Sequence, residues 1–260
     1  MSEQVIRVER SGDVATVTLD RPTKMNALNT ALRTAIHTSL AELDKDDAIA
    51  AVVLTGAGKA FCAGLDLKEL GGEEEGGESL AEAVSAGKLI KQLEGMRKPL
   101  IGAINGAAIT GGFEVALACD LLVASESARF ADTHARVGIL PTWGLSQRLS
   151  RTIGIYRARE MSLTGNFLDA ATAERWGLVN RVVPADELLP TCQQLARDMA
   201  SCDRTTMLAY KSVINEGYDL DLGDARRMER QRGEAHISRM DPNSVARRRA
   251  EVQQRGRSQT

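Results

Sequence analysis

Short β-prone runs alternate with helical patterns through the first half of the chain, and this alternation limits the possible folds more than any other feature of the sequence. The first two runs, Val5 to Arg10 and Val14 to Leu19, are separated by the turn sequence Ser11-Gly12-Asp13. This arrangement predicts a β-hairpin at the start of the domain.

A helix and a buried strand are expected next. Asn29 is a favourable N-cap, and four leucine or isoleucine residues follow it at helical spacing. They are Leu32, Ile36, Leu40 and Leu43. The apolar run from Ile49 to Thr55 then predicts a buried strand that ends at Gly56. Strand, helix and strand in this order are typical of an α/β fold.

A second round of the same pattern follows an acidic, glycine-rich segment, residues 71–78, which we expect to be a surface loop. The expected elements are a helix from about Leu80 to Met96, a strand from Leu100 to Ile104, a helix around Phe113 to Ala118 and a strand from Asp120 to Ala124.

The rest of the chain is mostly helical in pattern. From Gly144 onward, glycine turns separate helical segments, with one short strand expected at Val179 to Val183. The polar, arginine-rich tail from Ala246 is expected to fray.

Charge and composition exclude several classes of partner. The net charge of −2 and the pI near 6.0 give no global attraction to nucleic acid or to anionic membranes. The most apolar stretch, Pro99 to Ser125, contains Asn105, Glu114 and Asp120, which would be costly inside a bilayer. The opening residues lack the pattern of a secretory signal. We therefore expect a cytoplasmic protein.

The cysteines and histidines do not suggest a metal site. Cys62, Cys119, Cys192 and Cys202 show no CxxC spacing, and the three histidines are far apart in the sequence. We expect reduced thiols and no metal.

Three familiar catalytic motifs are absent. The sequence Thr55-Gly56-Ala57-Gly58-Lys59 does not complete a P-loop, because Val53 and Ala60 stand where glycine and serine or threonine belong. It does not complete a GxGxxG fingerprint either, because Phe61 stands where the third glycine belongs. Ser146 lacks the GxSxG context of a nucleophile elbow. Phosphate transfer, hydride transfer and serine hydrolysis all lose support.

Two glycine-containing turns remain, Phe61 to Lys68 and Asn105 to Glu114, each between an expected strand and an expected helix. The first N–H groups of a helix have no internal partner and lie at the positive end of its dipole. Such turns can stabilise a developing oxyanion.

These two turns resemble the paired oxyanion-hole motifs of the crotonase (enoyl-CoA hydratase/isomerase) family in their order and separation. Other segments carry the same resemblance over roughly Val5 to Gly217. They are Arg21 to Asn29, the group of Phe130, Gly138, Pro141 and Gln147-Arg148-Leu149, and Ala170 to Val183.

The resemblance implies a spiral of ββα units with a helical C-terminal region that builds homotrimers or dimers of trimers. It places the spiral core in residues 1–195 and the C-terminal helical region and basic tail in 196–260. It implies an acyl-CoA thioester as substrate, with coenzyme A as part of the substrate and no separate cofactor. On the family pattern, the backbone N–H groups of Leu65 and Gly111 form the oxyanion hole.

Glu114 is the main candidate for acid–base catalysis. It follows Gly111 by about one helical turn, so its side chain can lie beside the same site. A carboxylate in an apolar run tends to have a raised pKa, although it can also be a buried group satisfied by local N–H donors. The resemblance places Glu114 at a catalytic glutamate position.

His134 departs from the family, which has a second glutamate at this position. If Ala131 to His134 is extended, Asp132 shares a face with His134. His134 can be a catalytic acid–base group or a structural histidine. We expect Glu114 to dominate and His134 to support catalysis; if His134 replaces the second glutamate, substitution of either should cost a similar amount.

The resemblance also gives a set of substrate-binding residues. They are Lys24, Met25, Ala27, Leu28, Ala63, Asp66, Leu67, Lys68, Gly112, Asp132, Pro141 and Lys211. The lysines Lys24 and Lys68 suit CoA phosphates. Lys211 corresponds to a position near the CoA of a neighbouring subunit. The arginine-rich end departs from the family, which leaves acyl-chain preference open.

The predicted function is therefore an enoyl-CoA hydratase. A Δ3,Δ2-enoyl-CoA isomerase is the alternative with the same enolate chemistry. A CoA-thioester-binding protein with little turnover is the alternative of another class, because the second glutamate is missing.

Overall fold

A computed structural model describes residues 4–66, 68 and 87–258. The chain forms two compact units, Met1–Arg204 and Thr205–Thr260. Within the described residues, no helix is long and apolar enough to cross a membrane. The loop expected at 71–78 and the first part of the helix expected from Leu80 lie outside the described residues.

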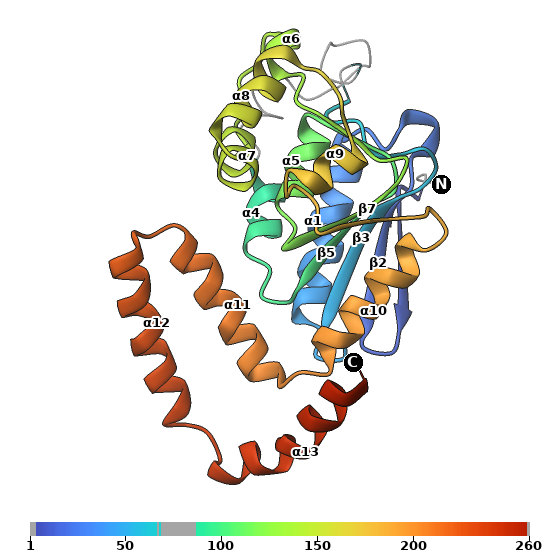
Figure 1. The fold of residues 1–260 in the computed structure, drawn as a ribbon. Helices are drawn as coiled ribbons and strands as arrows, with labels where there is room; N and C mark the ends of the chain where they lie inside the picture. Colours follow the sequence, from blue (N-terminus) through green and yellow to red (C-terminus); the bar gives the residue numbers. More distant parts are fainter. Residues whose placement is uncertain (1–3, 67, 69–86, 259–260) are drawn as a thin grey trace. The chain divides into compact units, whose positions relative to one another are not determined.

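The first unit contains a six-stranded sheet with the order β1-β2-β3-β5-β7-β10 (Figure 1). Its strands are β1 (Ile6–Ser11), β2 (Val14–Leu19), β3 (Ala51–Gly56), β5 (Leu100–Ile104), β7 (Leu121–Ser125) and β10 (Arg181–Val183). The pair β1–β2 is the expected antiparallel hairpin, and all other neighbours in this sheet are parallel. The strands expected from the sequence are confirmed with small shifts of their ends.

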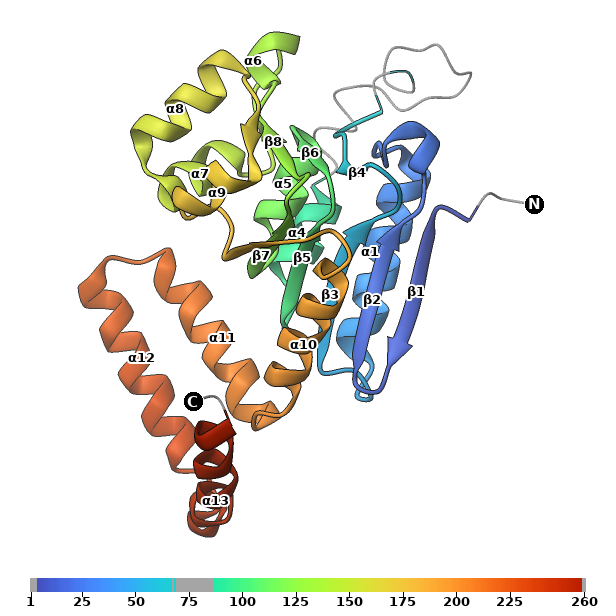
Figure 2. The ribbon, with the colours of Figure 1, turned by 45° about the vertical axis from the view of Figure 1, so that its right-hand side comes forward.

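Both faces of this sheet are covered, and alternate residues of its strands face different helices. Val52 and Leu54 pack in a core that includes helix α1 (Thr30–Lys45), whereas Val53 packs in a second core with helix α10 (Leu188–Ala200). The two helices lie on opposite sides of the sheet in Figure 2. Strands β2 and β3 are therefore buried along their whole length, and β3 begins with the apolar run Ala51 to Leu54.

Helix α1 begins where the sequence predicts. The side chain of Asn29 accepts a hydrogen bond from the backbone N–H of Leu32 at 2.9 Å, which satisfies one of the free donors of the first turn. At the other end, Lys98 is buried and its Nζ donates to the carbonyl of Leu43 at 2.6 Å. Helix α1 is thus tied to the start of β5.

A second, smaller sheet has the order β4-β6-β8-β9. Its strands are β4 (Ala60–Cys62), β6 (Ala107–Ile109), β8 (Arg129–Ala131) and β9 (Leu168–Asp169). Strands β4, β6 and β8 are parallel neighbours, and β9 pairs antiparallel with β8.

Short helices connect or follow these strands, and none of those named here is longer than 10 residues. They are the 3-10 turn η1 (Pro22–Lys24), α4 (Lys88–Glu94), α5 (Gly111–Leu117), α6 (His134–Val137), α7 (Leu145–Ile153), α8 (Ile155–Thr164) and α9 (Ala170–Arg175). Helix α5 is held against the small sheet by Phe113 and Phe130, whose ring centroids are 5.5 Å apart.

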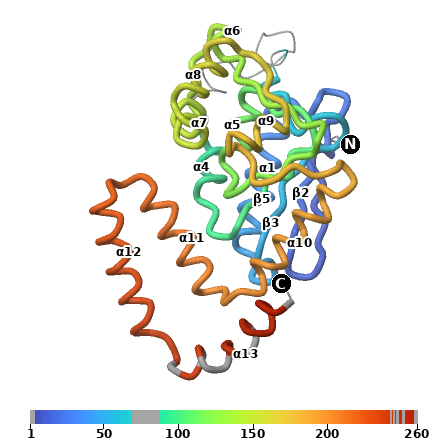
Figure 3. The backbone as a smooth tube through the Cα atoms, in the orientation of Figure 1, coloured from blue at the N-terminus to red at the C-terminus, as the bar shows by residue number. Residues whose placement is uncertain are grey.

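The second unit contains the rest of α11 (Arg204–Tyr218), together with α12 (Leu222–Ile237) and α13 (Pro242–Ser258) (Figure 3). The expectation that the tail frays from Ala246 is wrong, because α13 continues through it. The backbone N–H of Asn243 donates to the Asp241 side chain at 2.9 Å, and Pro242 suits the first helical position. The alanine, arginine and glutamine residues that follow are good helix formers.

The division between the two units falls at Arg204, whereas the sequence placed the boundary between 195 and 196. Residues 196–200 belong to α10, and Ala196 is buried in the core with β3 and β5. The functional division into a core and a C-terminal helical region stays a prediction.

Candidate active site

The predicted catalytic residues come from the ends of three neighbouring strands. Because β4, β6 and β8 are parallel, their carboxyl ends lie at one edge of the small sheet (Figure 2). Leu65 follows β4, Gly111 and Glu114 follow β6, and His134 follows β8. The carboxyl edge of parallel strands is the usual place for a ligand in α/β proteins.

The first turn brings Leu65 against the second turn. Gly64 has a φ of +96°, and a Cβ added to it would lie 2.9 Å from the Ile109 carbonyl oxygen and 3.3 Å from the Gly111 nitrogen. Glycine is therefore required at position 64 by its conformation and by this close approach. A Cβ on Gly111 would in turn lie 3.5 Å from the Leu65 nitrogen. The two backbone N–H groups thus belong to adjoining turns.

Neither of these N–H groups donates to another described residue. Leu65 lies opposite Leu28 in an isolated parallel β-bridge. The hydrogen bonds of this bridge use the residues on either side of Leu65, because the Leu28 N–H donates to the Gly64 carbonyl and the Asp66 N–H donates to the Leu28 carbonyl. Gly111 is the first residue of α5, where a helix leaves its N–H groups free. Two fixed donors that lack protein acceptors can stabilise an oxyanion.

The backbone before Gly111 is strained. Thr110 has a φ of 50° and a ψ of −111°, a conformation that residues with a branched Cβ rarely adopt. Its hydroxyl oxygen lies 2.5 Å from the hydroxyl oxygen of Thr133 and accepts from the Thr133 N–H at 3.2 Å. These bonds fix the turn before α5 to the turn that carries His134.

Glu114 is buried, with only 3% of its surface exposed. Its Oε1 accepts a hydrogen bond from the Trp143 N–H at 3.0 Å. Burial raises the pKa of Glu114, and the electrostatic interaction with His134 and the backbone N–H groups at Trp143 and Leu145 offset only part of this rise. Glu114 is therefore better suited to hold a proton near neutral pH than an exposed glutamate.

Asp132 and His134 form a close pair. His134 Nδ1 lies 2.7 Å from Asp132 Oδ1, which also accepts from the His134 backbone N–H at 3.2 Å. Burial favours the neutral form of Asp132, but the hydrogen bonds from His134 and Ser162 outweigh it and lower the pKa of Asp132. The other ring nitrogen, His134 Nε2, lies 3.8 Å from Glu114 Oε2.

The segment from Ala131 to His134 is not extended, so Asp132 and His134 do not share a strand face. Strand β8 ends at Ala131 and His134 begins α6, so Asp132 lies in the turn between them. The aspartate carboxylate folds onto the backbone N–H two residues ahead, as aspartates in turns commonly do. Asp132 and His134 meet through this local turn and not through a shared strand face.

The predicted CoA-binding residues fall into two facing loops. Met25 and Ala63 are joined, because the Ala63 N–H donates to the Met25 carbonyl at 3.0 Å. Lys24 and Lys68 are exposed, Leu28 is buried, and Ala27 and Ala63 are half-buried. Leu67 lies outside the described residues.

Asp66 already has protein partners. Its carboxylate is 3.0 Å from Arg21 Nη1, and the same guanidinium nitrogen donates to the Ala27 carbonyl. Asp66 therefore holds the two loops together through Arg21. The sequence did not predict the ion pair between Arg21 and Asp66. The one available signal was the position of Arg21 at the start of the Arg21 to Asn29 motif.

Three further predicted residues have different surroundings. A Cβ on Gly112 would lie 2.0 Å from the Cys62 carbonyl oxygen, so Gly112 is needed for packing of α5 on β4. Pro141 is half-buried in the segment between α6 and α7. Lys211 lies on α11, in the second unit.

Cys62 lies within the first of the two turns. It is fully buried, and burial raises the pKa of its thiol to about 12. The thiol therefore stays protonated near neutral pH and is a poor nucleophile. All four cysteines are free.

Besides Arg21, sequence reasoning missed four residues that support the catalytic groups. Trp143 holds Glu114, Ser162 holds Asp132, and the Thr110–Thr133 pair connects the two turns. These contacts join positions 23 or more residues apart, and hydrophobic periodicity does not reveal such contacts.

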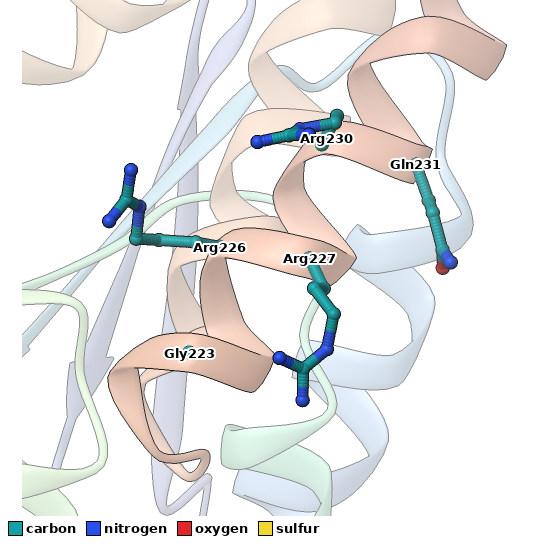
Figure 4. Close-up of a pocket in the computed structure, with 5 residues that line it drawn as sticks. All are labelled: Gly223, Arg226, Arg227, Arg230 and Gln231. Carbon is teal, nitrogen blue, oxygen red and sulfur yellow. The ribbon is translucent and has the colours of Figure 1, made fainter.

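A shallow pocket occurs on α12 in the second unit (Figure 4). It is lined by Gly223, Arg226, Arg227, Arg230 and Gln231. Figure 4 shows Arg226 and Arg227 pointing in different directions, so these side chains do not converge on one point. None of the sequence-predicted site residues lines it. No cluster of three or more metal-ligating side chains is found in the described part of the chain.

Comparison with known proteins gives consistent matches. A family model described as enoyl-CoA hydratase/isomerase matches residues 9–251. A relative from Arabidopsis thaliana, named "Probable enoyl-CoA hydratase 1, peroxisomal", is 44% identical over 92% of this chain and 89% of its own length. The structure of an enoyl-CoA hydratase from Bacillus anthracis superposes with a TM-score of 0.89 at 36% identity, covering 96% of this chain and 97% of that one.

An isomerase is also among the similar structures. A monofunctional enoyl CoA isomerase from M. smegmatis superposes with a TM-score of 0.74 at 36% identity, covering 85% of this chain and 97% of that one.

Proposed function

The chain belongs to the enoyl-CoA hydratase/isomerase family and has the crotonase fold, and from this premise we propose that it is an enoyl-CoA hydratase. The reaction is syn addition of water to a trans-2-enoyl-CoA. The observation that carries this proposal is the close approach of two N–H groups, at Leu65 and Gly111, that have no acceptor among the described residues and lie beside the turn that leads to the buried Glu114.

The two N–H groups would bind the thioester oxygen. Water attack at C3 moves the double-bond electrons toward this oxygen and produces an enolate. Donors that already point at the oxygen need no reorganisation as the charge develops, and such donors typically contribute about 10²–10³-fold each to the rate. The turns at Gly64 and Thr110 support this role, because Gly64 allows the close approach of the two turns and the Thr110 hydroxyl is hydrogen-bonded to the turn that carries His134.

Glu114 would exchange a proton with C2 of the substrate. Its raised pKa favours the protonated form that the enolate needs, and its Oε1 is fixed by Trp143. Its remaining oxygen, Oε2, is the atom nearest to His134. A positioned acid–base group of this kind typically contributes about 10²–10⁴-fold.

The CoA part would bind between the loops that contain Met25, Ala27 and Leu28 on one side and Ala63, Asp66 and Leu67 on the other. Main-chain contacts would dominate, with Lys24 or Lys68 near phosphates. Hydrogen exchange tests this placement. Free CoA should slow exchange at both loops, and unchanged exchange there would show that the groove lies elsewhere.

A product assay tests the reaction. Purified protein is incubated with 2-enoyl, 3-enoyl and 3-hydroxyacyl thioesters of several chain lengths. A 3-hydroxyacyl product from the 2-enoyl substrate supports the hydratase, whereas interconversion of 3-enoyl and 2-enoyl substrates alone supports the isomerase. Thioester binding without any conversion would contradict both enzymes. The isomerase stays as the second candidate because Glu114 is the only glutamate of the expected pair.

We also propose that the chain assembles as a homotrimer or as a dimer of trimers. Helices α11 and α12 bury none of their own described residues, and Tyr210, Ile214 and Tyr218 on α11 are exposed. Such faces become stable when another subunit covers them. In this assembly Lys211 would lie near the CoA of a neighbour. Light scattering at several concentrations measures the mass.

The remaining expectations are a cytoplasmic location and no cofactor beyond the CoA of the substrate. The location needs a direct test, because the Arabidopsis thaliana relative is named as peroxisomal. Cell fractionation tests the first expectation. Activity of protein that has been treated with a chelator and desalted tests the second for metals.

A further inference from the structure

Three ionisable side chains form a line at the carboxyl edge of the small sheet. Asp132 Oδ1 is 2.7 Å from His134 Nδ1, and His134 Nε2 is 3.8 Å from Glu114 Oε2. All three residues are buried, with 2%, 7% and 3% of their surfaces exposed in that order. A histidine between two buried carboxyl groups is costly to maintain as packing alone.

The pairing with Asp132 determines which ring nitrogen carries the proton. A carboxylate only accepts hydrogen bonds, so Nδ1 of His134 is the donor. In the neutral ring, Nε2 then has a free electron pair. This nitrogen is on the side of Glu114, and the distance of 3.8 Å is too long for a direct hydrogen bond but allows one water to contact both atoms.

We propose that His134, held in this tautomer by Asp132, is the base that activates the attacking water, while Glu114 supplies the C2 proton. This assignment rests on the proposed hydratase function and names a second acid–base group for it. The sequence left two roles for His134: it replaces the second glutamate of the family, or it only supports Glu114. The geometry favours the first role.

The proposed step conserves atoms and charge. His134 Nε2 removes one proton from water, the water oxygen bonds to C3, and the C2–C3 double-bond electrons move to the thioester oxygen as an enolate. The enolate then takes a proton from the Glu114 carboxylic acid at C2, which gives the 3-hydroxyacyl thioester. The proton on Nε2 returns to the Glu114 carboxylate through a water molecule that contacts both atoms, and both groups are restored.

Asp132 is a positioning residue in this account. It is held by the His134 backbone N–H and by the Ser162 hydroxyl from α8, so its carboxylate is fixed from two elements. Its negative charge also stabilises the imidazolium that forms during the step. Arg136 lies on the same short helix as His134, and its Nε donates a hydrogen bond to the Thr164 carbonyl at 2.7 Å.

The first test separates water activation from enolate formation. His134→Gln is compared with His37→Gln, a control on α1, which the proposal gives no role. Two rates are measured: hydration of a 2-enoyl-CoA, and exchange of the C2 proton of butyryl-CoA with deuterium oxide. Exchange needs Glu114 and the enolate but no attacking water.

We expect His134→Gln to lose hydration by roughly 10²–10⁴-fold while it keeps most of the C2 exchange. Hydration at the wild-type rate would overturn the proposal, and so would an equal loss of both reactions in a folded variant. A wild-type protein that exchanges C2 protons but hydrates no 2-enoyl-CoA would instead contradict the hydratase function itself.

The second test addresses the positioning role. Asp132→Asn should lower kcat less than His134→Gln does. Loss of the negative charge should also move the acid limb of the kcat/KM profile to lower pH, because the imidazolium loses a stabilising neighbour. The carboxyl groups that face the ring are Asp132 and Glu114. An acid limb at the same pH in Asp132→Asn would show that Asp132 has only a structural role.

Discussion

The two sheets of the first unit use parallel strands for different purposes. In the large sheet, β2 and β3 are six residues long and buried along their whole length, with helices on both faces. In the small sheet, β4, β6 and β8 have three residues each, and the residues that follow them include strained backbone and buried ionisable groups.

This difference separates stability from chemistry. The large sheet buries apolar side chains, which is the main favourable term in folding. The residues after the strands of the small sheet include a positive φ at Thr110 and a buried carboxyl group at Glu114, both of which oppose folding. Substitutions in the two sheets should therefore have different effects on stability and on catalysis.

The largest expected effect on catalysis is at Glu114. Glu114→Gln keeps the size of the side chain but cannot exchange the C2 proton, so hydration should fall by about 10²–10⁴-fold. Glu42→Gln, at an exposed position on α1, is the matched control. Steady-state kinetics measures both. Wild-type turnover in a folded, substrate-binding Glu114→Gln protein would remove the central catalytic assignment and leave Asp132 and His134 as candidates.

A substitution in the large sheet should lower stability and leave catalysis unchanged. Leu54 in β3 is fully buried in the main core. Leu54→Ala should lower the free energy of unfolding by about 2–5 kcal/mol, through lost burial and the cavity left behind. Denaturant unfolding measures this change. At a temperature where the variant is folded, kcat per folded molecule should stay near the wild-type value; a large drop would show that the two sheets are coupled.

Substitution of Gly64 should reduce both stability and catalysis. Gly64→Ala requires an alanine at a φ of +96° and brings its Cβ to 2.9 Å from the Ile109 carbonyl, so we expect a loss of about 1–3 kcal/mol in stability. Displacement of the Leu65 and Gly111 N–H groups should also reduce kcat/KM by roughly tenfold or more.

Gly12→Ala provides the control for this substitution. Gly12 also has a positive φ, +62°, but no atom lies within 4 Å of an added Cβ. Its stability should fall by about 1–2 kcal/mol while kcat/KM is unchanged. Equal kinetic effects at positions 12 and 64 would contradict the role given to the first turn.

The smallest expected effect is on the pH dependence of stability. The pKa of Glu114 is raised in the folded protein, so its contribution to stability is fully present at low pH and is lost as the pH rises through the folded pKa. Glu114→Gln does not ionise. Its stability should therefore match the wild type near pH 4 and exceed it near pH 8. Thermal unfolding across this range measures the difference, and a variant that becomes relatively less stable as the pH rises would contradict the raised pKa.

Sequence patterns predicted the large sheet well because the signals for its strands and helices are periodic and lie within a few consecutive residues. The Asn29 cap, the helical spacing up to Leu43 and the apolar run of β3 each follow from a few consecutive residues. The tail was predicted wrongly because its polar composition was taken as a sign of fraying, although arginine, alanine and glutamine favour helix when a cap is present.

The site was only partly predictable. The sequence motifs indicated Leu65, Gly111 and Glu114, and the structure brings their turns together at one edge. The sequence could not show how Asp132 reaches His134, because this contact depends on where β8 ends. The contact of Trp143 with Glu114 joins residues on different elements and has no local signal.

A crystal structure with a bound acyl-CoA would show directly whether Leu65 and Gly111 form the oxyanion hole. We expect the thioester oxygen to lie about 2.7–3.1 Å from both the Leu65 and the Gly111 backbone nitrogens, the range expected of an oxyanion hole. We also expect C2 and C3 to face Glu114 and His134. A thioester oxygen that contacts neither nitrogen, in a protein that turns over the same thioester, would contradict this assignment.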